Sequence, residues 1–320
     1  MAHCKFKPER DIPDLSGKII IVTGGNSGIG YHTVKQLLLK NATVYLAARS
    51  PEKAAAAITQ LQRETQKCAV FLELDLADLA SVRRAAEAFL AQESRLDVLF
   101  NNGGVMISPT DQLTAQGYDL QWGTNVTGHF LLTKLLLPAL TAAHTASGAP
   151  TRVIHTSSTG HAQAPARGVV FESLVGGPAR DKLVKKWGKM MAPWRLYGAS
   201  KLGNIILSDH YARAHGDVLV SCALHPGLIR SGIQRHGAGW FKTLTSVVFS
   251  PTPYGYRLTL RLRSVGAHNQ LWAGTVAPSA VISGKYFMPV GVPTKTDKRA
   301  KDPALVAEVL ACLRKQVEGF

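Results

Sequence analysis

The sequence IIIVTGGNSGIGYHTVKQLLLK, residues 19–40, decides the fold that we expect. The β-branched run Ile19–Thr23 predicts a buried strand, and the apolar stretch after the glycines predicts a helix. Gly24 suits a tight turn, Gly28 allows a close approach of backbone to ligand, and Gly30 lets the helix pack closely on the strand. A strand, a glycine turn and a helix N-terminus together present N–H groups and a positive dipole end to a pyrophosphate. We therefore predict a dinucleotide phosphate site at this turn.

Outward from this turn, short apolar runs alternate with helical stretches over the first 160 residues and again near the end of the chain. Such alternation indicates βαβ units and hence a parallel sheet with helices on both faces. We expect one Rossmann-type, doubly wound α/β domain over residues 1–320, with its cofactor-binding part at about 17–158. The mostly parallel sheet should have seven strands: Ile19–Thr23, Thr43–Ala48, Val70–Leu74, Asp97–Asn101, Arg152–Ser157, Leu219–His225 and Lys285–Met288. The helices after the first should cover Glu52–Gln66, Ala80–Ala91, Tyr118–Ala142 and Tyr197–Ala214, with a last one from Pro303.

Two segments, 159–196 and 231–253, interrupt the alternation. Long insertions in compact domains are usually lids or binding loops. In the first, Leu183, Trp187 and Met190 are spaced i, i+4 and i+7, which predicts an amphipathic helix. The two segments carry large apolar side chains, so we expect a lid over a lipophilic substrate; these are Trp187, Met190, Met191, Trp194, Trp240 and Phe241.

The composition excludes several classes of protein. With 320 residues, 46% of them hydrophobic and 18% charged, the chain has enough apolar side chains for a sizeable core and is neither disordered nor a small disulfide scaffold. Cysteines 4, 68, 222 and 312 form no CxxC and no metal-ligand spacing, so we expect reduced thiols and no metal. The first residues lack an apolar signal segment, and the longest apolar run, GHFLLTKLLLPAL, is interrupted by Lys134 and Pro138. We expect a cytoplasmic location.

The net charge of +16 is uneven, since residues 1–166 carry +2 and residues 167–320 carry +14. A basic half can serve solubility, a nucleic acid, an anionic membrane or acidic small molecules. No zinc spacing, recognition helix or RNP-like aromatic run accompanies it, so we expect no nucleic acid partner.

The end of the second strand bears on the choice of cofactor. An acidic residue there would accept hydrogen bonds from a ribose 2′-hydroxyl and favour NAD. The sequence is LAARS, with Ala48 in the expected acidic place and Arg49 beside it. A guanidinium can pair with a 2′-phosphate, so the prediction is NADP(H).

A tyrosine four residues before a lysine places both side chains on one helix face, where the ammonium can lower the phenol pKa. Tyr197–Lys201 (YGASK) and Tyr31–Lys35 (YHTVK) both have this spacing. Tyr31 directly follows the glycine turn and is more typical of packing. Tyr197 follows a strand that ends in Ser157–Ser158, whose hydroxyls can bind a substrate oxygen, so we select the second pair as a proton donor or acceptor.

These motifs, in this order, resemble the short-chain dehydrogenase/reductase family over about Gly17–Tyr286: TGGNSGIG, NNGG at 101–104, Asn125, the serine pair, YGASK and HPG at 225–227. Stretches such as LAARS, NNGGVM and TNVTGHFLLTKLLLP look similar to the retinol-dehydrogenase-like branch, including its fungal members.

The resemblance implies a catalytic role for four residues. Tyr197 would exchange a proton with the substrate oxygen, and Ser158 would hydrogen-bond that oxygen. Lys201 would hold the nicotinamide ribose and lower the pKa of Tyr197, and Asn125 would support a water relay to Lys201. The implied cofactor-binding residues, besides Tyr197 and Lys201, are Gly24, Asn26, Ser27, Gly28, Ile29, Gly30, Arg49, Asp75, Leu76, Asn102, Gly103, Gly104, Pro226, Gly227, Ile229 and Ser231.

We therefore expect an NADP(H)-dependent oxidoreductase that acts on a carbonyl or alcohol of a lipophilic small molecule, with reduction favoured. The alternative is an NADP(H)-binding sensor or scaffold without turnover. A homodimer is compatible with the sequence. The basic stretch 181–191 leaves two hypotheses open: peripheral contact with an anionic membrane, or a closed lid whose lysines are merely solvated.

Overall fold

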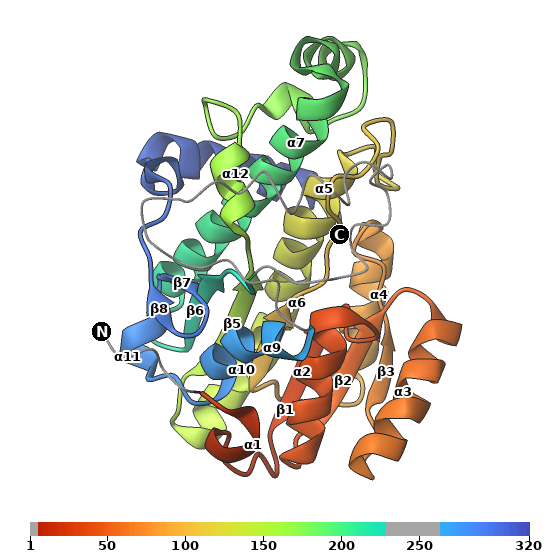
Figure 1. Ribbon diagram of the computed structural model, residues 1–320, viewed down its shortest axis with the longest axis vertical. Coiled ribbons are helices and arrows are strands. Elements are labelled where there is room, and N and C mark those ends of the chain that lie inside the picture. The colour runs from red at the N-terminus through yellow and green to blue at the C-terminus, as the bar shows by residue number, and fades with distance from the viewer. Residues whose placement is uncertain (1–5, 228–262) are drawn as a thin grey trace.

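The computed structural model describes residues 6–227 and 263–320 around one central sheet (Figure 1). Its strands lie in the order β3-β2-β1-β4-β5-β6-β7-β8. Neighbours from β3 to β7 pair in parallel, as in a doubly wound sheet. The strands are β1 (Ile19–Thr23), β2 (Thr43–Ala48), β3 (Val70–Glu73), β4 (Val98–Asn101), β5 (Thr151–Thr156), β6 (Leu219–Leu224), β7 (Tyr286–Met288) and β8 (Val292–Pro293).

The sheet has one strand more than the sequence predicted. β8 is two residues long and pairs antiparallel with β7. A two-residue segment has no hydrophobic period to detect, and its proline is tolerated because β8 is an edge strand. The other seven strands begin and end within one residue of the predicted bounds, so the predicted doubly wound fold is confirmed.

Helices cover both faces of the sheet, and each face has its own apolar core. One core includes Ile20 and Val22 and lies beneath α2 (Gly28–Leu39), α3 (Pro51–Thr65) and α10 (His268–Thr275). The other includes Ile21 and lies beneath α4 (Leu79–Leu90), α6 (Gly128–Ser147), α7 (Pro178–Ala214) and α12 (Pro303–Gln316). Burial of β1 on both faces explains its unbroken apolar run. The shorter elements are α1 (Pro8–Asp11), α5 (Leu120–Trp122), η1 (Gly123–Thr127), η2 (Thr159–Gln163), η3 (Phe171–Ser173), α9 (Arg263–Gly266), α11 (Ser279–Ile282) and η5 (Lys298–Lys301).

The helix predicted over Tyr118–Ala142 consists of three pieces. α5 leads into the π-helical turn η1, which leads into α6, and α6 continues to Ser147. Residues 121–133 are all buried, so the sequence has no amphipathic period there that the extra residue of the turn could interrupt. By length and composition, residues 120–147 could cross a membrane, but 67% of the most apolar window is buried inside the protein.

The predicted amphipathic helix of the first insertion is wrong in one respect. α7 is broken at Gly188, whose φ of +77° is far from helical. Met190 therefore lies beyond the break and off the face of Leu183 and Trp187, with 55% of its surface exposed. Trp187 is half-buried, with the Arg195 guanidinium 5.6 Å from its ring centroid.

Some sequence predictions fall outside the described residues. They concern the second insertion, 231–253, with Trp240 and Phe241, and two implied cofactor residues, Ile229 and Ser231.

Candidate active site

The glycine turn joins β1 to α2. Gly24 has a φ of +66° and Gly28 a φ of +56°, both in the region that favours glycine. A Cβ on Gly30 would lie 2.2 Å from the carbonyl oxygen of Gly24, so only glycine fits there. A Cβ on Gly28, the first residue of α2, would meet no described atom within 4 Å. The helix N-terminus, flanked by Asn26, Ser27 and Ile29, thus faces open space of the kind a pyrophosphate needs.

Thr23, which the sequence did not single out, ties this turn to the NNGG loop. Its Oγ1 accepts hydrogen bonds from the backbone N–H of Asn102 (2.9 Å) and of Gly103 (2.8 Å). The Asn102 carboxamide donates to the Thr23 carbonyl at 2.7 Å, so that amide is used within the protein. A polar residue that ends a buried strand is the signal that could have identified Thr23.

Arg49 directly follows β2 and is exposed. Within the described parts of the chain, its guanidinium has no hydrogen-bond or ion-pair partner, so it is available to an anion. Asp75 accepts a hydrogen bond from the Ala77 N–H at 2.9 Å, and Leu76 is buried next to Gly103. These positions are compatible with the cofactor-binding role that the resemblance implied for both residues.

Ser158, Tyr197 and Lys201 come together where β5 ends. The Ser158 hydroxyl accepts from the Gly160 N–H at 3.0 Å, and it lies near enough to the Tyr197 phenol to lower the pKa of that phenol. The Lys201 ammonium is 5.8 Å from the centroid of the Tyr197 ring. A Cβ on Gly160 would lie 2.7 Å from that ring, so the 159–163 turn packs directly on the tyrosine. The selected pair therefore lies beside the selected serine.

The pKa values in this cluster are set mainly by burial. Burial raises the pKa of Tyr197 to about 12, although the hydrogen bond with Ser158 opposes this. Burial lowers the pKa of Lys201 to about 8, and its ammonium donates to the Thr156 carbonyl at 2.9 Å. The lowering of the phenol pKa that the resemblance implied is not found in this arrangement, because burial is the largest cause and acts in the opposite direction. At neutral pH the phenol is a proton donor.

Asn125 lies at the centre of the π-helical turn and is fully buried. Its carboxamide accepts from the Val105 N–H (2.9 Å) and donates to the Val105 carbonyl (2.9 Å) and the Ser200 hydroxyl (3.0 Å). It therefore joins the loop after β4 to the residue before Lys201. The water relay stays a prediction.

His129 connects the two halves of the site. Its Nδ1 donates to the Asn125 carbonyl at 3.0 Å, and its Nε2 is 2.9 Å from Thr23 Oγ1. Burial lowers the pKa of His129 to about 4, so the ring is neutral at physiological pH.

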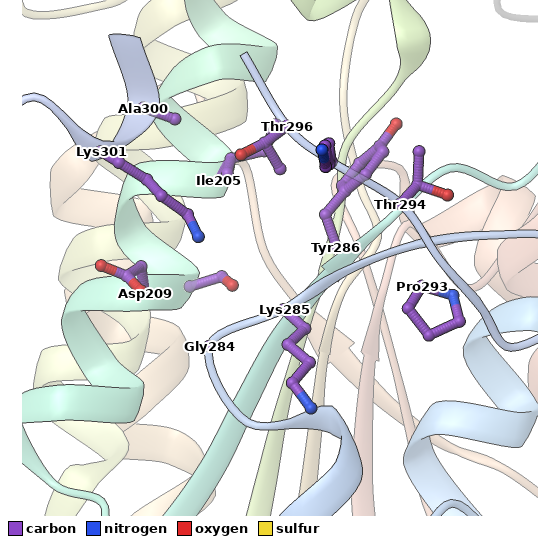
Figure 2. A pocket seen from close by; sticks show the side chains of 12 residues that line it. Ile205, Asp209, Gly284, Lys285, Tyr286, Pro293, Thr294, Thr296, Ala300 and Lys301 are labelled. Atoms are coloured by element: carbon purple, nitrogen blue, oxygen red, sulfur yellow. The ribbon is translucent and has the colours of Figure 1, made fainter. Parts of the chain in front are cut away.

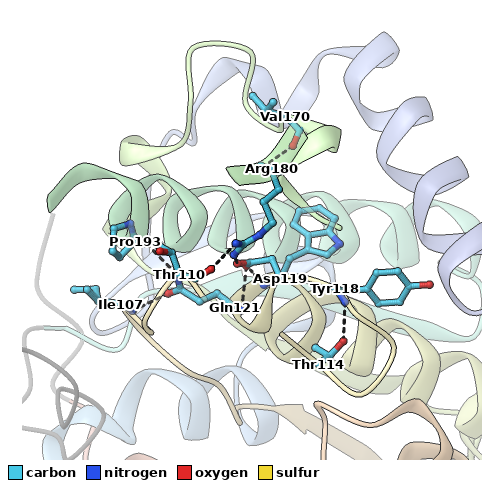
Figure 3. Close-up of polar contacts among 11 residues, drawn as sticks. Ile107, Thr110, Thr114, Tyr118, Asp119, Gln121, Val170, Arg180 and Pro193 are labelled. Atoms are coloured by element: carbon cyan, nitrogen blue, oxygen red, sulfur yellow. Dashed lines mark hydrogen bonds and ion pairs between the residues drawn. The ribbon is translucent and has the colours of Figure 1, made fainter. Parts of the chain in front are cut away.

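A buried ion pair anchors the first insertion, and Figure 3 shows it between Arg180 of α7 and Asp119, which precedes α5. The two charged groups are 2.8 Å apart, and each side chain is 3% exposed. Arg180 also donates to the Thr110 carbonyl, and Asp119 caps α5 at the Gln121 and Trp122 N–H groups. Burial raises the Asp119 pKa although the pairing opposes it. Because Arg180 and Asp119 are 61 residues apart in the chain, the sequence alone did not indicate that they form an ion pair.

Gln121 fixes the loop after β4 in a strained shape. It accepts from the Ile107 N–H at 2.7 Å and donates to the Pro193 carbonyl at 3.0 Å. Ile107 has a φ of +52°, which is rare for a β-branched residue and marks stored strain near a site.

The second Tyr–Lys pair serves the structure. Lys35 forms an ion pair with Glu64 at 2.9 Å, and Tyr31 packs against the core beneath α2.

A hollow of about 340 Å³ lies between α7 and the β7–β8 segment, with Lys285 and Lys301 at its rim (Figure 2). Tyr286 forms part of its wall, and burial, with Tyr197 nearby as a second cause, raises the pKa of the Tyr286 phenol. Tyr286 thus lines this hollow and is also near enough to Tyr197 to interact with it electrostatically. Gly227, with a φ of +97°, and Pro226 follow β6, as expected for the HPG motif.

Comparison with known proteins agrees with this geometry. Residues 18–173 match the family described as short chain dehydrogenase. A short-chain dehydrogenase/reductase of Armillaria gallica is 45% identical over 97% of this chain and 93% of its own length. An uncharacterised protein of Mycobacterium paratuberculosis has a similar structure, with a TM-score of 0.70 and 28% identity over 98% of this chain and 97% of that one. RhlG of Pseudomonas aeruginosa, solved as a complex with NADP, gives a TM-score of 0.61 and 26% identity over 87% and 96%.

Proposed function

The chain belongs to the short-chain dehydrogenase/reductase family, an oxidoreductase family that acts on CH–OH and C=O groups with NAD(P)(H), and we propose that it uses NADPH to reduce the carbonyl group of a lipophilic small molecule. The observation that carries this proposal is the buried cluster of Ser158, Tyr197 and Lys201 beside an open glycine turn. A binding protein without turnover does not need a buried phenol close to both a serine hydroxyl and an ammonium.

The chain's residues would bind the cofactor along one edge of the sheet. The N-terminus of α2 would receive the pyrophosphate, and Lys201 would donate to the nicotinamide ribose. NADPH supplies a hydride to the substrate carbon when it is bound. Ser158 and Tyr197 would orient the substrate oxygen, and the Tyr197 phenol would give it a proton. Burial raises the pKa of Tyr197 to about 12, so the phenol carries at neutral pH the proton that reduction requires.

The preference for the phosphorylated cofactor rests on Arg49. It is exposed, has no carboxylate partner within the described residues, and stands beside Ala48, so nothing there repels a 2′-phosphate. RhlG, the similar protein from Pseudomonas aeruginosa, was solved with NADP, which agrees with this preference.

The substrate class rests on the insertion anchored by Arg180. Trp194 meets the Tyr197 ring edge-on at 6.5 Å, so an aromatic surface borders the reacting phenol. Together with the sequence stretches that look similar to the retinol-dehydrogenase-like branch, this favours retinoid-like, steroid-like, fatty-aldehyde-like or secondary-metabolite-like substrates and a place near that branch.

We also propose a cytoplasmic protein that touches anionic membranes through the first part of α7, which projects beyond the sheet in Figure 1. Lys182, Lys185, Lys186 and Lys189 are all exposed there. Trp187 is half-buried against Arg195, which supports the closed-lid alternative for that side chain. Co-sedimentation with anionic but not neutral vesicles, lost when the four lysines become glutamine, is expected; no sedimentation with anionic vesicles would favour the closed lid.

A panel of retinoids, steroids, fatty aldehydes and aromatic ketones, followed by NADPH absorbance, tests the function. We expect turnover of at least one lipophilic carbonyl, faster with NADPH than with NADH. Tight NADPH binding without turnover of any member would favour the sensor alternative, and a preference for NADH would overturn the cofactor assignment.

A further inference from the structure

One side chain of the last helix reaches the turn that carries Asn125. Gln316 of α12 accepts, at a single oxygen, hydrogen bonds from the Trp122 indole N–H (3.1 Å) and the Thr127 hydroxyl (2.8 Å). Trp122 directly precedes the π-helical turn and Thr127 ends it. One carboxamide oxygen therefore joins the two ends of the turn.

The contact is fully internal. Trp122 and Thr127 are 0% exposed and Gln316 is 6% exposed, so water does not compete for these hydrogen bonds. The Gln316 backbone carbonyl also accepts from the Tyr118 phenol at 3.3 Å, which fixes the end of α12 at the start of the same region. The Gln316 carboxamide nitrogen, Nε2, is buried and has no hydrogen-bond partner among the described residues. An unpaired buried donor is unfavourable for folding, so packing alone does not explain a glutamine here.

A π-helical turn needs such support. It contains one residue more than an α-helical turn, it is rare, and single π turns occur frequently at functional sites. Here the wider turn places the Asn125 carboxamide against both Val105 and Ser200. Ser200 directly precedes Lys201, so the width of the turn is linked to the reacting cluster.

We propose that Gln316 is a positioning residue: it holds the π-helical turn open to the width at which Asn125 joins the loop after β4 to the helix of Tyr197 and Lys201. The inference rests on the proposed function for its effect on turnover. Its effect on the turn itself is independent of any substrate.

The experiment compares Gln316→Met with Val309→Ala. The methionine keeps the length of the side chain and removes the strong acceptor. Val309 lies two turns earlier on α12, is fully buried in the same core and has no hydrogen bond to the turn, so its truncation reports a merely loosened helix. Gln316→Glu is the conservative variant, because its carboxyl group keeps an acceptor oxygen.

Hydrogen exchange of the backbone amides of residues 123–128 is the first measurement. Gln316→Met should speed this exchange about tenfold, since two hydrogen bonds are lost, whereas Val309→Ala should leave it within about twofold. Gln316→Glu should restore slow exchange. Equal exchange in Gln316→Met and Val309→Ala would overturn the proposal. If Gln316→Met does not fold, Thr127→Val removes one of the two donors and should speed the exchange of the same amides.

Steady-state kinetics are the second measurement. Gln316→Met should lower kcat about tenfold and leave the KM for NADPH within about twofold, because the glycine turn is untouched. Faster exchange with an unchanged kcat would overturn the positioning role. If the wild-type protein turns over no carbonyl, the proposed function fails, and the exchange comparison still decides whether Gln316 holds the turn.

Discussion

Two tyrosine–lysine pairs with identical spacing lie in two regions of this protein, and only their surroundings differ. Tyr31–Lys35 is on α2, directly behind the glycine turn, and Tyr197–Lys201 is on α7. Both phenols have a pKa raised to about 12, mainly by burial. The lysines differ: Lys35 is about one third exposed and paired with Glu64, whereas burial lowers the pKa of Lys201 to about 8.

The comparison teaches that the spacing fixes only which side chains share a helix face. Chemistry depends on what else reaches that face. At Tyr197 it is a serine hydroxyl from the turn after β5 and a backbone carbonyl that accepts from the ammonium. At Tyr31 it is the carboxylate of Glu64 at the surface. A perturbed phenol pKa alone does not separate the two regions.

The largest expected difference is in turnover. Tyr197→Phe should lower NADPH-dependent carbonyl reduction by about 10²- to 10⁴-fold, because the proton donor is lost, while NADPH binding persists. Tyr31→Phe should change the rate by no more than about twofold, as is usual for a substitution away from a site. Comparable losses in both variants would mean that the wrong pair was chosen.

A smaller effect separates cofactor binding from chemistry. Arg49→Ala should raise the KM for NADPH about tenfold to a hundredfold, because a charge-assisted hydrogen bond to the 2′-phosphate is lost. The KM for NADH and the kcat should stay nearly unchanged. Equal changes for the two cofactors would show that Arg49 does not bind the 2′-phosphate.

The pH profile tests the lysines. The Lys201 ammonium is present below its pKa of about 8 and is lost above it, while the phenol stays protonated throughout. The rate of reduction should therefore be level below pH 8 and fall about tenfold per pH unit above it. Lys35→Met should keep this limb, and Lys201→Arg should move it to higher pH. A limb that Lys201→Arg does not shift would assign the titration to another group.

The smallest effect is on stability. Lys35→Met removes a partly exposed ion pair with Glu64 and should lower the free energy of unfolding by less than about 1 kcal/mol. Urea denaturation of the variant and the wild-type protein measures this difference. A decrease of several kcal/mol in the free energy of unfolding would show that the Lys35–Glu64 ion pair stabilises the fold more than its exposure suggests.

The sequence predicted the parts of this protein that are local. The alternation of apolar runs located seven strands, and the glycine turn and the YGASK spacing pointed to the two halves of the candidate site. The rest depends on partners far apart in the chain. The π-helical turn and the Arg180–Asp119 ion pair leave no periodic signal, since each depends on tertiary contacts. The helix break at Gly188 is a local exception, because its φ of +77° is one that favours glycine.

The buried ion pair between Arg180 and Asp119 should respond to salt differently from the exposed charges of this protein. Mobile ions screen charges that face water, with a Debye length of about 8 Å at physiological ionic strength, and they do not enter a protein core. At 3% exposure, the pair that fixes the insertion is out of their reach, whereas Arg49 faces the solvent. Rising ionic strength should therefore weaken the proposed contact between Arg49 and the cofactor's 2′-phosphate. It should leave the Arg180–Asp119 ion pair, which anchors the insertion, unchanged.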